Sequence, residues 1–239
     1  FSPEKILADK IVASTVEEKQ LFISNGFKEE DILETGMARF ELIEKKTVHI
    51  NKILYAPSWR NYLVGDYVNH QWLPLDDKFL NSKFYSEIKK FIQSKELEEI
   101  LEKNNYILEI KLHPIFSMYQ KYFDFNSSRI KFVSSEVTEG EYSLFVTDFS
   151  SYVYNFIYLD IPTINFIPDI LEFKCGMNGY RELNYPLEFW ENVATSAEDI
   201  VEQIDQFVTF GKKNKSYTHF FDFNSPREDL YKIVIAQTK

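Results

Sequence analysis

Four short motifs place polar or small residues where predicted strands end. They are Thr35–Arg39, Tyr55–Arg60, Lys111–Pro114 and Thr147–Ser151. Ser150 and Ser151 fall where a helix is predicted to begin, and helix N-termini bind anions through backbone N–H groups and the helix dipole. His113 can donate a proton or a hydrogen bond to a phosphate oxygen, and Arg39 can hold a second phosphate. Together the motifs predict a site for a phosphorylated ligand.

Each motif also has a purely structural interpretation. Ser150 and Ser151 can be helix N-caps. Pro57–Ser58 can form a turn that ends a strand. Arg39 and Arg60 can form ion pairs at the surface. The order of the four motifs along the chain therefore carries the functional interpretation.

The elements that position these motifs alternate in type. Strand-like runs are predicted at 10–14, 31–34, 52–56, 106–112, 144–147 and 163–167, and helices at 16–25, 81–103, 152–159 and 196–210. This alternation predicts an α/β fold, a Rossmann-like parallel sheet with flanking helices. In such folds ligands bind at the carboxyl ends of the strands, where the motifs lie. The polar stretch Glu41–Asn51 is the predicted boundary between two strand–helix systems.

Composition narrows the class of protein further. The 239 residues are 44% hydrophobic and 27% charged, which is typical of a globular protein. A net charge of −10 argues against a general nucleic-acid binder. The single cysteine, Cys175, cannot form an internal disulfide, which favours a reducing compartment. The chain begins without Met or a signal-peptide pattern, so we expect a cytoplasmic location and a piece of a longer protein.

Several familiar catalytic patterns are absent from the sequence. There is no Gly-x-Gly-x-x-Gly, phosphate-loop or Gly-x-Ser-x-Gly motif, which argues against dehydrogenases, P-loop kinases and α/β-hydrolases. There is no Asp-x-Asp motif, and the four histidines are far apart and lack zinc-site spacing. We therefore expect neither a cofactor nor a bound metal.

The four motifs, in this order, resemble the CDP-glycerol glycerophosphotransferase family, whose members build teichoic acids and related capsule polymers. The family pattern is Thr-Gly-x-x-Arg, Tyr-Ala-Pro-Thr-Trp-Arg, Lys-x-His-Pro, then Thr-Asp-Tyr-Ser-Ser and a strand bearing Pro, here Pro162. The resemblance spans residues 10–210. It implies the C-terminal half of a GT-B type transferase. Residues 1–48 would end the N-terminal domain and its linker, and residues 49–239 would form the donor-nucleotide-binding domain.

The resemblance also implies an activity and its site. The reaction is transfer of glycerol phosphate, or ribitol phosphate, from a CDP-alditol to a growing polymer with release of CMP. His113 would be the catalytic residue, acting on the departing phosphate, and the general base would lie on the N-terminal half. A lipid-linked or polymer acceptor implies contact with the inner face of the membrane. The implied donor-binding residues are Arg39, Pro57, Ser58, Lys111, Leu112, His113, Ser150, Ser151 and Asn155.

Two departures keep alternatives open. Asn155 stands where the family usually has Asp, and the family's Trp-His-Gly element is absent. One alternative is another GT-B nucleotide-sugar transferase or a sugar-nucleotide epimerase, which would prefer UDP or another nucleotide. The other is a nucleotide-binding domain without catalysis. Nucleotide preference separates the two enzyme hypotheses, and activity separates both from the binding domain.

Overall fold

The computed structural model describes residues 3–5, 8–37, 39, 40, 43, 51–134, 136–175, 192–211, 232, 235 and 236. The chain divides into two compact units. The first comprises Phe1–Lys46, Tyr158–Asp160 and Lys215–Lys239, and the second comprises Thr47–Ile157 and Ile161–Asn214. Each unit is described separately below.

In the described part of the first unit, two short parallel strands flank the helix α1. β1 (Ile11–Val12) pairs with β2 (Ile32–Leu33), and α1 (Val16–Ser24) connects them after the N-cap Thr15. The Thr15 side chain accepts the Glu18 N–H at 3.0 Å, which satisfies a free donor of the first helical turn. The strand, helix and strand predicted for this region are confirmed.

The second unit is built on a six-stranded sheet in which every strand pair is parallel. The order is β10-β9-β8-β3-β6-β7. The strands are β3 (Lys52–Tyr55), β6 (Ile107–Ile110), β7 (Ile130–Phe132), β8 (Leu144–Thr147), β9 (Thr163–Phe166) and β10 (Val193–Ala194). The predicted parallel sheet is confirmed. β7 and β10 were not predicted, because runs of three and two residues show no measurable periodicity.

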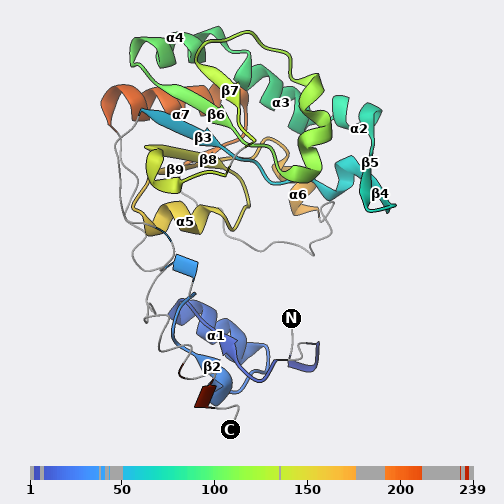
Figure 1. Ribbon diagram of the computed structural model, residues 1–239, viewed down its shortest axis with the longest axis vertical. Coiled ribbons are helices and arrows are strands. Elements are labelled where there is room, and N and C mark those ends of the chain that lie inside the picture. The colour runs from blue at the N-terminus through green and yellow to red at the C-terminus, as the bar shows by residue number, and fades with distance from the viewer. Residues whose placement is uncertain are drawn as a thin grey trace. The chain divides into compact units, whose positions relative to one another are not determined.

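Helices cover both faces of this sheet (Figure 1). α3 (Lys83–Ile92), α4 (Lys95–Lys103) and α7 (Ala197–Phe210) lie on one face, and α5 (Val153–Tyr158) lies on the other. Prediction of a single helix over 81–103 is wrong. Ser94 has extended backbone angles and its Oγ accepts the Leu97 N–H at 3.2 Å, so the chain ends one helix and caps the next. The remaining short helices are α2 (Asp76–Leu80) and α6 (Ile170–Lys174).

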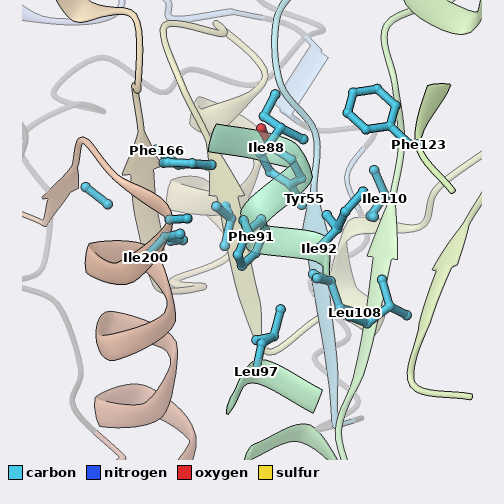
Figure 2. Packing of buried hydrophobic residues seen from close by; sticks show 14 of the residues in the cluster. Tyr55, Ile88, Phe91, Ile92, Leu97, Leu108, Ile110, Phe123, Phe166 and Ile200 are labelled. Atoms are coloured by element: carbon cyan, nitrogen blue, oxygen red, sulfur yellow. The ribbon is translucent and has the colours of Figure 1, made fainter. Parts of the chain in front are cut away.

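The main core lies between the sheet and the helices α3, α4 and α7 (Figure 2). Tyr55 of β3 meets Phe91 of α3 edge to face, with ring centroids 5.5 Å apart, and Phe166 of β9 lies 5.6 Å from Phe91. Each such fully buried side chain contributes about 1.5–3 kcal/mol. Glu87 of α3 accepts the Ala197 N–H of α7 at 2.9 Å, so a carboxylate joins these helices at the positive end of α7. The core thus fixes the strand ends that carry the motifs.

A hairpin of β4 (Val64–Val68) and β5 (Gln71–Pro74) follows β3. Its turn residues Asn69 and His70 both have positive φ, 50° and 64°, as tight hairpin turns require. The sequence analysis did not predict this hairpin, because Asn-His is a weaker turn signal than Asn-Gly. Among the residues that the structure describes in the two units, 3₁₀ segments border the strands and helices at Pro3–Lys5, Glu29–Asp31, Asn61–Leu63, Pro114–Tyr122 and Glu139–Glu141.

The strand order reverses beside β3. From β3 the chain builds β6 and β7 on one side, and then returns to add β8, β9 and β10 on the other. β3 and β8 are therefore the strands at the topological switch point. In open parallel sheets the loops that follow such a pair diverge, and ligands bind beyond their carboxyl ends. The motifs at Tyr55–Arg60 and Thr147–Ser151 follow these two strands.

Candidate active site at the carboxyl edge of the sheet

Three of the four motifs meet at the carboxyl edge of the sheet. Backbone hydrogen bonds continue the parallel ladder past the strand ends: Lys111 N–H donates to the Tyr55 carbonyl, and Ala56 N–H donates to the Val146 carbonyl, both at 2.9 Å. The Thr147 hydroxyl donates to the Ala56 carbonyl at 2.8 Å. These bonds bring the loops that follow β3, β6 and β8 side by side, as the sequence predicts.

A buried guanidinium joins two of these loops to the loop after β9. Arg60 is fully buried, and its Nη1 donates to Asp148 Oδ2 at 2.8 Å. Its Nε and Nη2 donate to the two carboxylate oxygens of Asp169 at 2.6 and 2.9 Å. Tyr62 adds a hydroxyl hydrogen bond to Asp169, and the guanidinium lies 4.5 Å from the centroid of the Phe84 ring. Prediction of Arg60 as a surface ion pair is therefore wrong.

The charges of this cluster stabilise one another. Burial alone would lower the pKa of Arg60, but Asp148 and Asp169 outweigh burial and raise it above its ordinary value. Burial would raise the pKa of Asp169, but the charge and hydrogen bonds of Arg60 outweigh it, so this pKa is lowered. Arg60 and Asp169 are therefore both ionised at neutral pH. The sequence analysis missed Asp169, although it stands just after a predicted strand in Ile167-Pro168-Asp169, where a strand-end search would find it.

Asp148 also holds the loop after β3 through Ser58. Its Oδ1 accepts the Ser58 hydroxyl at 2.6 Å, and both of its oxygens accept the Ser58 N–H at 3.0 Å. Asp148 thus binds both the backbone amide and the hydroxyl of Ser58. Pro57, beside it, is buried. Ser58 itself is only half-buried and keeps a surface toward solvent.

His113 lies at the end of the loop after β6. Its Nδ1 accepts the Ile115 N–H at 3.3 Å, and its ring centroid lies 6.2 Å from that of Trp59. Burial lowers the pKa of His113, and the charge of Asp148 only partly opposes this. The imidazole is therefore neutral at pH 7. Since Nδ1 is an acceptor, the single ring proton lies on Nε2, which is a hydrogen-bond donor.

Ser150 and Ser151 form the turn that precedes α5. The Ser150 hydroxyl accepts the Tyr152 N–H at 3.2 Å, and the Ser150 carbonyl accepts the Val153 N–H at 3.1 Å. The helix begins at Val153, one residue later than predicted from the sequence, and has six residues. Ser151 is exposed. The pair therefore shapes a tight turn, and its contact with a phosphate stays a prediction.

The remaining predicted residues are placed as follows. Lys111 and Leu112 are half-buried in the loop after β6. Asn155 of α5 donates from Nδ2 to Glu139 Oε1 at 2.9 Å, and its buried Oδ1 has no partner among the described residues. Arg39 belongs to the first unit, where its guanidinium lies 5.1 Å from the centroid of the Phe40 ring. The other predicted donor-binding residues all belong to the second unit.

Within the described ranges, no three His, Cys, Asp or Glu side chains are grouped so that they could hold a metal ion. Among the helices in those ranges, none has the length and apolar character needed to cross a bilayer.

Comparison with known proteins adds independent information. The family model described as CDP-Glycerol:Poly(glycerophosphate) glycerophosphotransferase matches residues 9–225. The minor teichoic acid biosynthesis protein GgaB of Bacillus subtilis is 24% identical over 214 residues, 79% of this chain and 23% of GgaB. The teichoic acid poly(glycerol phosphate) polymerase of Bacillus spizizenii is 25% identical over 233 residues, 89% of this chain and 51% of that protein. The chain spans about half or less of these relatives.

Solved structures match in fold. The wall teichoic acid polymerase TagF covers 96% of this chain with a TM-score of 0.59 and 18% identity, over 58% of the TagF chain. The UDP-GlcNAc 2-epimerase of Methanocaldococcus jannaschii, solved with UDP-GlcNAc and UDP, covers 97% with a TM-score of 0.58 and 14% identity, over 62% of that chain. At these identities the likeness concerns the fold, and it confirms the predicted GT-B type α/β architecture.

Proposed function

The chain belongs to the CDP-glycerol:poly(glycerophosphate) glycerophosphotransferase family, and we propose that it carries the donor-binding half of an enzyme that moves glycerol phosphate from CDP-glycerol to a growing teichoic acid polymer. Residues 1–48 would end the N-terminal domain and 49–239 would form the donor domain. The observation that supports this most is the meeting of Ser58, His113 and Asp148 beyond three neighbouring parallel strands at the switch point.

The reaction is a phosphoryl transfer. An acceptor hydroxyl attacks the phosphorus that carries the glycerol, and the bond from this phosphorus to the bridging oxygen breaks. The bridging oxygen leaves with its electron pair on CMP. The acceptor proton goes to a general base, which the family resemblance places on the N-terminal half. Such transfers depend mainly on positioning and on stabilisation of charge at the phosphate oxygens.

His113 can supply part of that stabilisation. Its ring is neutral and its Nε2–H is the free donor, so it can bind an oxygen of the departing phosphate without adding a full positive charge. Lys111, two residues earlier, begins the loop that follows β6. We place the diphosphate between this loop and the Ser150–Ser151 turn of the same unit. The role of Arg39 as a phosphate ligand stays a prediction from the family resemblance.

Turnover of the complete enzyme tests the role of His113. His113→Ala is expected to lower turnover by about 10²–10⁴-fold while changing donor affinity far less. The matched control is His70→Asn, because His70 is an exposed histidine in the β4–β5 turn and lies outside the four motifs. Unchanged turnover in His113→Ala would remove the catalytic assignment.

Titration calorimetry with CDP-glycerol, CDP-ribitol, CMP and UDP tests the donor. Tighter binding of a CDP-alditol than of UDP is expected, and the tighter of the two alditols identifies the transferred group. A preference for UDP would instead favour a nucleotide-sugar transferase or epimerase. Binding of CDP-glycerol without any transfer by the complete enzyme would favour the non-catalytic domain.

The acceptor and the location follow from the same proposal. TagF and the Bacillus spizizenii relative are named as polymerases of teichoic acid. A polymer acceptor, lipid-linked at one end, would bring the enzyme to the inner face of the membrane in the cytoplasm. Co-sedimentation of the complete enzyme with vesicles that carry such an acceptor, compared with vesicles without it, tests this location.

A further inference from the structure

Ser58 has two hydrogen-bond donors, and Asp148 uses both. The backbone N–H lies 3.0 Å from each carboxylate oxygen, and the hydroxyl lies 2.6 Å from Oδ1. The carboxylate also accepts Nη1 of Arg60 at 2.8 Å. Both carboxylate oxygens therefore act as acceptors, Oδ1 from the Ser58 N–H and Oδ2 from the Ser58 N–H and Arg60. The proton shared between Asp148 and Ser58 therefore belongs to the serine and points at the aspartate.

Only the lone pairs of the Ser58 oxygen remain for a ligand. A serine hydroxyl has one proton and two lone pairs, so a hydroxyl whose proton is committed acts only as an acceptor. Ionised phosphate oxygens are also only acceptors. A hydrogen bond between Ser58 and a phosphate would lack a proton, and the two oxygens would repel each other.

The charge behind Ser58 opposes an anion as well. Asp148 and Asp169 carry two negative charges, and Arg60 carries one positive charge that both of them share. The buried cluster is therefore net negative. Arg60 is fully buried and its Nε, Nη1 and Nη2 all donate within the cluster, so it offers no surface to a diphosphate.

We propose that Ser58 determines donor specificity as a hydrogen-bond acceptor: it binds a hydroxyl or amino group of the CDP-alditol, and the diphosphate lies elsewhere, by the loops after β6 and β8. The inference rests on the proposed function and deepens it. The groups of a CDP-alditol that can donate to Ser58 are the two ribose hydroxyls, the cytosine amino group and the alditol hydroxyls. Asp148 and Arg60 are positioning residues, since they orient the serine proton away from the ligand.

A double-mutant cycle between Ser58→Ala and the ligand tests this. Calorimetry compares wild type and Ser58→Ala with CDP-glycerol and four analogues, each lacking one kind of donor: 2′-deoxy, 3′-deoxy, UDP-glycerol without the amino group, and CDP-ethanol without the glycerol hydroxyls. One neutral hydrogen bond corresponds to roughly 2- to 10-fold in affinity. We expect Ser58→Ala to lower the affinity for CDP-glycerol by this factor. The affinity for the one analogue that lacks the recognised group should be the same in Ser58→Ala and wild type.

Other outcomes separate the two proposals. If Ser58→Ala lowers the affinity for all five ligands equally, or for none of them, the acceptor role of Ser58 is wrong while the proposed function stands. If wild type binds none of the CDP ligands, the proposed function fails, and the inference fails with it. Ser58→Thr, which keeps the hydroxyl, serves as the rescue variant and is expected to retain the pattern of wild type across the five ligands. Should Ser58→Ala not fold, Ser58→Cys replaces it, because a thiol is a weak acceptor.

Discussion

Replacement of Arg60 by methionine removes the positive centre of the buried cluster. Methionine fills much of the space of the arginine stem, so the change mainly deletes charge. It leaves the carboxyl groups of Asp148 and Asp169 almost fully buried and without their cation. Breaking a buried ion pair by removing one partner costs about 3–5 kcal/mol. For a domain of this size that corresponds to a fall in Tm of about 6–20 °C, at roughly 2–4 °C per kcal/mol.

Thermal and urea unfolding, followed by circular dichroism at pH 7, measure the effect. Arg129→Met is the matched control, because the Arg129 guanidinium donates to Asn105 Oδ1 at 3.0 Å in an exposed setting. We expect the control to change the free energy of unfolding by less than about 0.5 kcal/mol. Asp169→Asn added to Arg60→Met removes one uncompensated charge, and is expected to recover part of the loss.

The pH dependence gives a second check on the same reasoning. Arg60 lowers the pKa of Asp169, so the ion pair between them stabilises the folded protein at neutral pH. This stabilisation is lost as the pH falls through the lowered pKa of Asp169. The gap in stability between wild type and Arg60→Met should therefore narrow in acid. A Tm of Arg60→Met equal to that of Arg129→Met, or a double variant less stable than Arg60→Met, would refute the account of this cluster.

Two further predictions concern single groups. Glu87→Ala should lower the free energy of unfolding by about 1.5–3 kcal/mol, because the α7 N-terminus loses a charged acceptor, and urea unfolding that detects less than about 0.5 kcal/mol would contradict this. For His113, burial lowers the pKa below its ordinary 6.5, so the unfolded chain takes up its proton first and stability falls as pH drops through that value. His113→Gln should therefore lose less stability than the wild type between pH 7.5 and pH 5.5. Urea unfolding of both proteins at these two pH values measures the difference. An equal loss of stability in the two proteins would contradict the prediction.

Much of the architecture is visible in the chain itself. Alternating strand-like and helical runs indicate a parallel α/β sheet, because period and segment length are local properties of sequence. The motifs at Tyr55–Arg60, Lys111–Pro114 and Thr147–Ser151 follow predicted strands, and parallel strands must end at one edge. Their convergence could thus be expected before any coordinates. The break at Ser94 could not, because the apolar spacing of 81–103 continues through it.

Tertiary structure alone decided the roles of the charged residues. Arg60 meets Asp148 and Asp169 across separations of 88 and 109 residues, and no local pattern encodes which loop lies beside which. That neighbourhood depends on the strand order, in which β3 lies next to β8 and β8 next to β9. The same order turns Arg60 from an apparent surface residue into a buried bridge. It also directs both donors of Ser58 to Asp148, because the loops after β3 and β8 meet at the switch point.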